Sequence, residues 1–241
     1  MKSDDMQPSK ASMTGRSSTS LLLTKRHVAM ALIFIAGYVD VVGYLTLSGV
    51  FVAFMSGNST LSGLYLGQGK SVAIAKVVLP IPIFILSVGV GSWMMRRDHG
   101  LRILLLLQVA LLTTFAVISN SAMLNAQPRG DAWIVLTLTG VFAMGLQNAV
   151  VRHIGKDNVG LTYITGMLAA LGVHLASWLD RSEPQAGVHI GLLASLWLSF
   201  LAGATLSSWL SLKFGVTLLP PLIMLLVLLL LDFRRPLLTS L

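Results

Sequence analysis

Eight stretches of mostly apolar residues follow one another along the chain, and short polar turns separate them. Several approach the roughly 20 residues that a helix needs to cross the hydrocarbon core of a bilayer. The pattern therefore predicts an all-α fold, a polytopic integral membrane helical bundle. The eight stretches are residues 27–48, 51–69, 72–95, 101–119, 132–151, 160–179, 188–212 and 214–231. Prolines at 80, 82, 220 and 221 are expected to kink helices or to begin them.

The composition also favours a membrane protein, since 55% of the 241 residues are hydrophobic and only 11% are charged. Soluble domains carry about 25% charged residues. The net charge of +8 lies in short loops and tails. This placement is typical of the positive-inside rule, so we expect no nucleic-acid partner. The chain has no cysteine, and its five histidines show no ligand spacing, so we expect no metal site and no cofactor.

We expect one membrane domain with a tail at each end. Residues 1–26 are mostly polar and rich in Ser and Thr, which predicts a disordered cytoplasmic tail. The apolar run that follows is too long for the hydrophobic part of a signal peptide, so we expect a retained membrane helix. The single transmembrane domain then covers residues 27–232, and residues 233–241 form a second cytoplasmic tail.

The two halves of the domain, residues 27–119 and 132–232, match at three places in the same order. Ala-Gly-Tyr-Val-Asp at 36–40 corresponds to Met-Gly-Leu-Gln-Asn at 144–148. Phe-Met-Ser-Gly-Asn at 54–58 corresponds to Tyr-Ile-Thr-Gly-Met at 163–167. A run of small residues that ends in Trp93 corresponds to one that ends in Trp209. These matches indicate an internal duplication, with four elements in each repeat.

The basic residues discriminate between two topologies. Eight complete spans, with the N-terminus inside, place 11 of the 17 Lys and Arg residues on the cytoplasmic side. If the second and sixth stretches are shorter and re-entrant, six crossings remain, and 13 basic residues are cytoplasmic. The positive-inside rule favours the six-crossing topology. Each half then crosses three times, so the halves are inverted relative to each other, an arrangement that recurs in secondary transporters.

Asp40 is the residue around which we expect a binding site. It is the only charged residue between His27 and Lys70, and it lies about 18 Å along its helix at 1.5 Å per residue. A carboxylate near mid-bilayer costs about 2.5–3.5 kcal/mol on insertion scales, so it indicates a function by default. It can serve a proton, a cation or a cationic solute. Alternatively it pairs with donors inside the bundle, and we expect Asn58 among its partners.

Seven further residues complete the predicted substrate-binding site, and all are polar or small and lie in the matched motifs. Gly57 can break its helix, and Asn58 can then direct donors at a ligand, or these groups only join helices. Gln147 fits interhelical bonding as well as ligand contact. The predicted set is Asp40, Ser56, Gly57, Asn58, Gln147, Asn148, Thr165 and Gly166.

Two other groups receive a structural interpretation. Arg152, His153 and Lys156 form a basic loop that we interpret as a determinant of topology. His174 has no identifiable partner in the sequence, so we interpret it as a packed or interfacial histidine.

The motifs AGYVD, FMSGNST, MGLQNAVVR and TYITG, in this order and at these spacings, resemble those of the YoaK-like bacterial inner-membrane proteins. That family is defined as a domain of unknown function. The resemblance covers roughly residues 27–232, and Ser56 stands where the family often has Thr. It implies a multi-pass protein of the bacterial cytoplasmic membrane, and it implies no established substrate, activity or cofactor.

Two functions from different classes fit these residues. We favour a secondary transporter or permease for a small solute, with Asp40 recognising charge or coupling a proton or cation. The alternative is a non-transporting structural or accessory membrane protein, in which the polar residues only join helices. A cavity that joins Asp40, Asn58 and Gln147 would favour the first.

We expect no enzymatic activity, because no G-x-S-x-G, H-E-x-x-H or P-loop motif occurs. The expected location is the bacterial inner membrane, with the lipid bilayer as partner and the N-terminus in the cytoplasm.

Overall fold

The computed structural model describes the backbone of residues 10–123, 130–154, 164–234 and 237, and side chains from residue 25 onward except 121–123. Every regular element in these ranges is an α-helix, which confirms the all-α prediction. The helices are α1 (Lys10–Thr46), α2 (Met55–Gly67), α3 (Ser71–Val78), α4 (Pro80–Met94), α5 (Gly100–Met123), α6 (Asp131–Ile154), α7 (Ile164–Leu179), α8 (Ala186–Phe214) and α9 (Leu219–Arg234).

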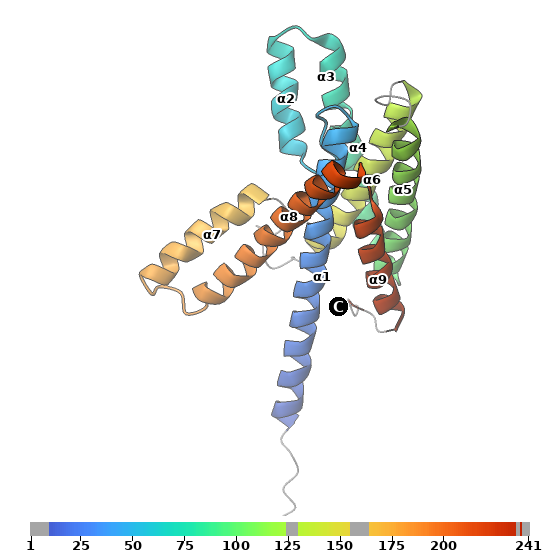
Figure 1. Cartoon of the computed structure of the whole chain (residues 1–241). Helices are drawn as coiled ribbons and strands as arrows, with labels where there is room; N and C mark the ends of the chain where they lie inside the picture. The colour runs from blue at the N-terminus through green and yellow to red at the C-terminus, as the bar shows by residue number, and fades with distance from the viewer. Residues whose placement is uncertain (1–9, 124–129, 155–163, 235–236, 238–241) are drawn as a thin grey trace, which may run out of the picture.

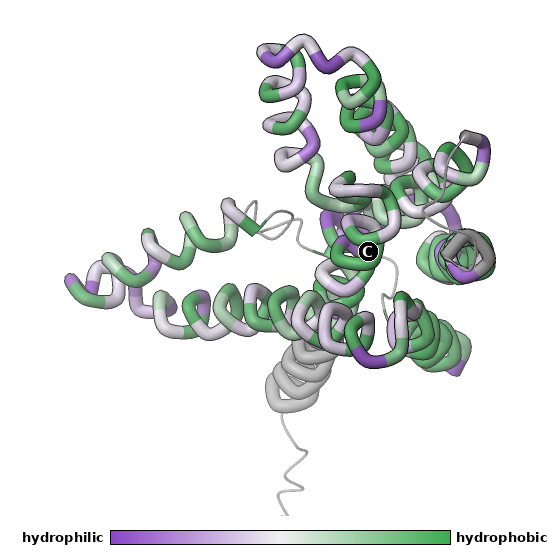
Figure 2. Tube along the Cα trace, turned by 45° about the horizontal axis from the view of Figure 1, so that its top comes forward, coloured by the Kyte–Doolittle hydropathy of each residue, from purple (hydrophilic) through white to green (hydrophobic). Residues whose placement is uncertain are grey.

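The surface of the bundle is apolar, as a bilayer requires. Five helical stretches in the described ranges are long and apolar enough to cross a membrane: Lys25–Thr46, Ser71–Met94, Gly100–Asn120, Asp131–Ile154 and Ala186–Phe214. Many large apolar side chains on these helices remain exposed. Figure 2 shows helices that are mostly green to white, with purple near the tips of the hairpins. The chain is a polytopic membrane helical bundle.

Helix α1 begins earlier than the sequence pattern predicts. The structure places its start at Lys10, whereas the first apolar stretch begins at residue 27. No proline follows Pro8 until Pro80, so nothing in the polar stretch prevents the apolar helix from extending backwards. Residues 1–9 lie outside the described ranges.

Prolines set two helix starts, as expected. Helix α3 ends at Val78, and α4 begins at Pro80, where the missing N–H is tolerated. Helix α9 begins at Leu219, so Pro220 and Pro221 lie in its first turn. The eighth predicted stretch therefore divides, because its first residue, Phe214, is the last residue of α8.

The two polar stretches form short helices. Helix α2 has 13 residues and α7 has 16, which correspond to about 20 and 24 Å at 1.5 Å per residue. Both are shorter than the roughly 30 Å hydrocarbon core. In Figure 1, α2 and α3 form a hairpin at the top, and α7 forms a second hairpin with the first part of α8.

Close helix crossings hold the bundle together. Helix α1 packs along α8, and α4 packs along α6. A Cβ atom at Gly37 would overlap the carbonyl oxygen of Phe200, and one at Gly203 would overlap that of Phe34. At the other crossing, a Cβ atom at Gly145 would overlap Ser87. Small residues let membrane helices approach backbone to backbone, and here they do so at both crossings.

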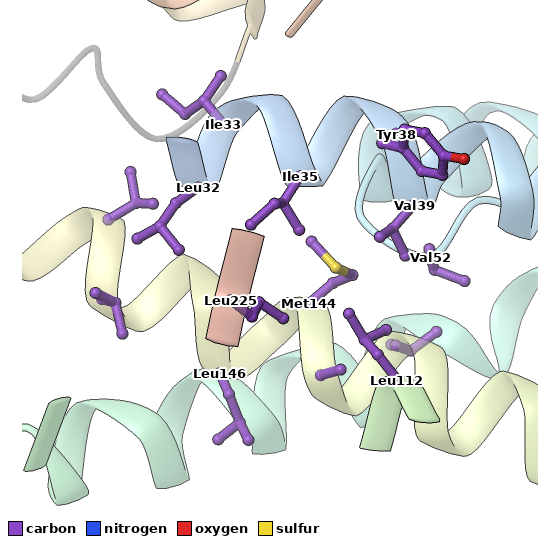
Figure 3. Close-up of a cluster of buried hydrophobic side chains, with 14 of the residues drawn as sticks. Leu32, Ile33, Ile35, Tyr38, Val39, Val52, Leu112, Met144, Leu146 and Leu225 are labelled. Carbon is purple, nitrogen blue, oxygen red and sulfur yellow. The ribbon is translucent and has the colours of Figure 1, made fainter. Parts of the chain in front are cut away.

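The apolar core lies between α1 and α6. Figure 3 shows Ile35 and Val39 of α1 pointing toward Met144 of α6. Ile35 and Val39 are fully buried, and so is Leu112 of α5, a helix that packs against α6. Helix α5 packs against both α6 and α9, and these contacts close the bundle on that side.

The crossing of α1 and α8 gives the first prediction. We expect Gly37→Ala to lower the free energy of unfolding by about 1–3 kcal/mol, the usual cost of overpacking. The added methyl group meets backbone atoms of Phe200, which cannot move aside as a side chain can. Thermal unfolding of the purified protein in detergent measures the change.

Gly172→Ala in α7 is the matched control, because a Cβ atom there meets nothing within 4 Å. Alanine is preferred to glycine inside a helix by about 0.5–1 kcal/mol, so this variant should match or exceed the parent. Equal stability of the two variants would contradict the close crossing.

Candidate functional site

Helices α1 and α6 run antiparallel through the centre of the molecule, and two hydrogen bonds fix their register. The indole Nε1 of Trp133 donates to the carbonyl oxygen of Leu47 at 3.5 Å. The amide Nε2 of Gln147 donates to the carbonyl oxygen of Leu32 at 2.7 Å. Residue numbers therefore fall along α1 as they rise along α6. This register places Ala36 at about the same level as Met144.

A cavity of about 330 Å³ opens beside this helix pair. Helices α1 and α6 form two of its walls, the beginnings of α2 and α7 enter it, and α4 and α8 contribute one phenylalanine each. Its lining residues are Ile33, Ala36, Asp40, Ala53, Phe54, Met55, Ser56, Phe84, Met144, Gln147, Asn148, Val151, Arg152, Ile164, Thr165, Met167 and Phe200. The lining is mostly apolar, with a few polar groups, as small-molecule sites commonly are.

Asp40 lines the cavity and also organises the chain between α1 and α2. Its Oδ1 atom accepts hydrogen bonds from the backbone N–H groups of Val52, Ala53 and Phe54, at 2.9, 2.8 and 3.3 Å. These N–H groups belong to a segment outside any helix. Asp40 is only 4% exposed. The carboxylate therefore acts as a structural acceptor through one oxygen, and Oδ2 takes no part in these three bonds.

Asn58 is a structural residue, and it is not a partner of Asp40 as the sequence led us to expect. Its Nδ2 donates to the carbonyl oxygen of Phe51 at 2.7 Å, and its Oδ1 accepts from the N–H of Phe51 at 3.0 Å. The side-chain amide thus satisfies both the N–H and the carbonyl group of Phe51, which lies outside any helix. Asn58 is fully buried and does not line the cavity.

Gln147 joins three helices. Besides its bond to Leu32 of α1, its Oε1 accepts a hydrogen bond from Nε2 of Gln108 in α5. Gln108 is buried, and it was not among the predicted site residues. Its position as the one polar residue in the apolar run 103–112 was the signal that could have identified it. Gln147 combines the interhelical bonding with a place at the cavity.

Of the eight predicted site residues, the structure brings five together at the cavity: Asp40, Ser56, Gln147, Asn148 and Thr165. The remaining three, Gly57, Asn58 and Gly166, do not line it. At Gly57, a Cβ atom would overlap the ring of Phe54, so the glycine allows that ring to pack closely. Gly57 and Asn58 therefore shape the cavity wall indirectly.

Arg152 also lines the cavity, although the sequence analysis interpreted it only as a topology determinant. The register of α1 and α6 places Arg152 level with residues 27–28 of α1. That level lies about 18 Å from Asp40 along the helix, at 1.5 Å per residue. The cavity thus has an acid near one end, a base near the other and apolar walls between them.

The fold and the site define the class of this chain: a multi-pass α-helical membrane protein with a cavity inside the bundle. It belongs to the family described as "Protein of unknown function (DUF1275)", which matches residues 28–231. The resemblance to YoaK-like membrane proteins is thereby confirmed.

Two curated relatives are named as transmembrane proteins. UPF0700 transmembrane protein RA0705 of Rhizobium meliloti (strain 1021) is 30% identical over 213 residues, which are 80% of this chain and 87% of that protein. UPF0700 transmembrane protein YoaK of Bacillus subtilis (strain 168) is 28% identical over 137 residues, 56% of this chain and 60% of that protein. No solved structure matches the chain.

The bonds of Asp40 give the second prediction. Asp40→Asn keeps an oxygen in the place of Oδ1 and removes a buried charge, so we expect the variant to fold and to unfold near the parent's melting temperature. Asp40→Leu leaves three backbone N–H groups without their acceptor. Each buried unsatisfied group costs about 1–3 kcal/mol, so this variant should be severely destabilised.

Thermal unfolding in detergent across a range of pH compares the two variants. If Asp40→Asn is as unstable as Asp40→Leu at every pH, the carboxylate is chiefly a structural acceptor. The binding role of Asp40 would then be lost.

Proposed function

We propose that this protein is a secondary transporter or permease for a small solute, which binds in the cavity between α1 and α6. The observation that carries the proposal is that one cavity gathers Asp40 with polar residues from both matched halves of the chain. Secondary transporters commonly bind their substrate between repeats, near broken helices at mid-membrane. The described lining residues include no nucleophile–base pair, and we propose no enzymatic activity.

The helix crossings support an internal duplication. Under the motif match, Gly37 corresponds to Gly145, and Ser87 corresponds to Gly203. All four residues lie at the two crossings. Gly37 lies against Phe200 and Ala204 of α8, Gly203 lies against Phe34 of α1, and Gly145 lies against Ser87. A duplicated unit whose first helix packs on the third helix of the other copy explains both contacts.

The antiparallel course of α1 and α6 supports an inverted arrangement of the halves. These helices are the first elements of the two repeats, so opposite directions mean opposite insertion. With α1 and α6 both spanning, the chain crosses an odd number of times before α6 begins. Helix α2 then returns to the side from which it entered, in agreement with its 13 residues. This arrangement supports six crossings in place of eight.

The same topology supports a proposal for the cellular location. We propose the bacterial inner membrane, with the N-terminus in the cytoplasm, because this orientation places 13 of 17 basic residues inside. In that orientation the end of the cavity near Arg152 faces the cytoplasm, and Asp40 lies near the opposite end, deeper in the bundle.

The lining indicates the chemical class of the solute. Aromatic and methionine side chains form apolar walls, with Phe84 and Phe200 among them, and Asp40 contributes an acid. Rings and carboxylates together favour a cation with an apolar body. We therefore propose a small amphipathic amine as the ligand. The polar side chains of Ser56 and Asn148, which also line the cavity, would fix its orientation.

A structural or accessory role is the second candidate, and specific observations favour it. Asp40, Asn58 and Gln147 each bond to backbone or side-chain groups of the protein itself. These bonds would be needed in a bundle that transports nothing. Occupancy of the cavity by a ligand separates the two candidates.

The third prediction tests this occupancy with three matched ligand series: arylalkylamines, the corresponding carboxylates and the corresponding alcohols. We expect only the amines to raise the melting temperature of the purified protein. A ligand present at 100 times its Kd stabilises by about 2.7 kcal/mol. Ala36→Leu, which fills part of the cavity, and Asp40→Asn, which removes the charge, should both lose this stabilisation.

Ala169→Leu in α7 is the control, since Ala169 is exposed and does not line the cavity. It should respond to the amines as the parent does. If no series stabilises the parent and Ala36→Leu simply melts higher, the cavity is a packing void. The accessory role would then replace the transporter.

A further inference from the structure

The turn between α7 and α8 brings together two of the five histidines and a glutamate. Nδ1 of His174 lies 2.9 Å from Oε2 of Glu183, and Nδ1 of His189 lies 3.1 Å from Oε1. One ligand atom from each residue lies within 4.8 Å of the others. The two imidazole rings are 4.6 Å apart, centroid to centroid. Three groups that bind metals therefore converge from α7, the turn and the first turn of α8.

The geometry of His189 indicates more than a hydrogen-bonded cluster. Nδ1 of His189 is buried and has no hydrogen-bond partner among the described residues, although Oε1 of Glu183 lies beside it. His174, in contrast, hydrogen-bonds Glu183. A buried ring nitrogen that faces a carboxylate without a hydrogen bond is suited to a shared cation between them.

The carboxylate is available as an anionic ligand. Glu183 lies in the turn outside both helices, with one carboxylate oxygen beside each imidazole. Neutral imidazole and ionised carboxylate are the forms that bind metals. All three side chains are between 23% and 35% exposed, so the cluster lies close to solvent, although Nδ1 of His189 is itself buried.

We propose that His174, Glu183 and His189 form a binding site for a divalent transition metal, with Zn²⁺ as the best match. Two histidines and one glutamate are a known zinc ligand set that leaves a fourth position for water. Zinc–ligand bonds of about 2.0–2.2 Å place tetrahedral ligand atoms about 3.4 Å apart. The two nitrogen–oxygen distances at Glu183, 2.9 and 3.1 Å, are near this value.

The position of the site gives it a mechanical consequence. The three ligands join the C-terminal part of α7 to the beginning of α8. The other end of α7, at Ile164 and Thr165, lines the cavity. A bound metal therefore fixes the hairpin that carries one wall of the cavity. The metal site itself does not depend on the proposed transport function.

The fourth prediction tests the site with Zn²⁺ itself, on the full chain purified without a polyhistidine tag and treated with a chelator. We expect one Zn²⁺ per chain in a competition titration against a chromophoric zinc chelator. His174→Gln and Glu183→Gln should each weaken binding by about tenfold or more, since loss of even an outer-shell partner has an effect of that size. Both variants should remain monodisperse.

His99→Asn is the matched control, because His99 lies exposed in the α4–α5 turn, away from α7 and α8. It should bind Zn²⁺ as the parent does. Co²⁺ provides a readout on the parent alone: a tetrahedral site of two imidazoles and a carboxylate gives intense visible bands. Absence of stoichiometric Zn²⁺ binding, an octahedral Co²⁺ spectrum, or equal affinity in folded His174→Gln would each overturn the proposal.

Discussion

A backbone that leaves its helix at membrane depth must find hydrogen-bond partners within the protein, because the hydrocarbon core offers none. In the proposed re-entrant topology the chain meets this constraint at residues 51–54, between α1 and α2, and two side chains satisfy it. Asp40 accepts three N–H groups from one side, and Asn58 holds the main chain of Phe51 from the other. Specific hydrogen bonds therefore hold the non-helical connection between α1 and α2, and the beginning of α2 is held against the cavity.

The crossings of the helices determine where the cavity lies. Because Gly37 and Gly145 have no side chains, α1 and α6 each pack closely against a helix of the other half. Their remaining faces turn toward each other, with apolar core on one side and the cavity on the other. The small residues at the crossings and the polar residues at the α1–α2 connection thus together determine the position of the cavity. Asp40 has a role in both, since it accepts hydrogen bonds from the α1–α2 connection and also lines the cavity.

The sequence could predict the helices and much of the site, because the relevant signals are local. Asp40 and Gln147 stood out as polar residues inside apolar stretches, and both line the cavity. Arg152 was missed because its position after a helix suggested only a loop. Asn58 was assigned the wrong partner because the path of residues 51–54 depends on tertiary contacts. The His174 cluster was missed because only the α7–α8 hairpin brings its members together.

Labelling of single cysteines tests the central claim, that the two halves are inserted in opposite orientations. The chain has no native cysteine, so an impermeant maleimide applied to intact cells reports one position at a time. Gln68 and Asp98 are exposed in the turns after α2 and α4, whereas a side chain at Gly100 would overlap Met94. The six-crossing arrangement predicts that Gln68→Cys is labelled and Asp98→Cys is protected until the cells are permeabilised. Eight complete spans reverse both results, and that reversal would contradict the inverted halves.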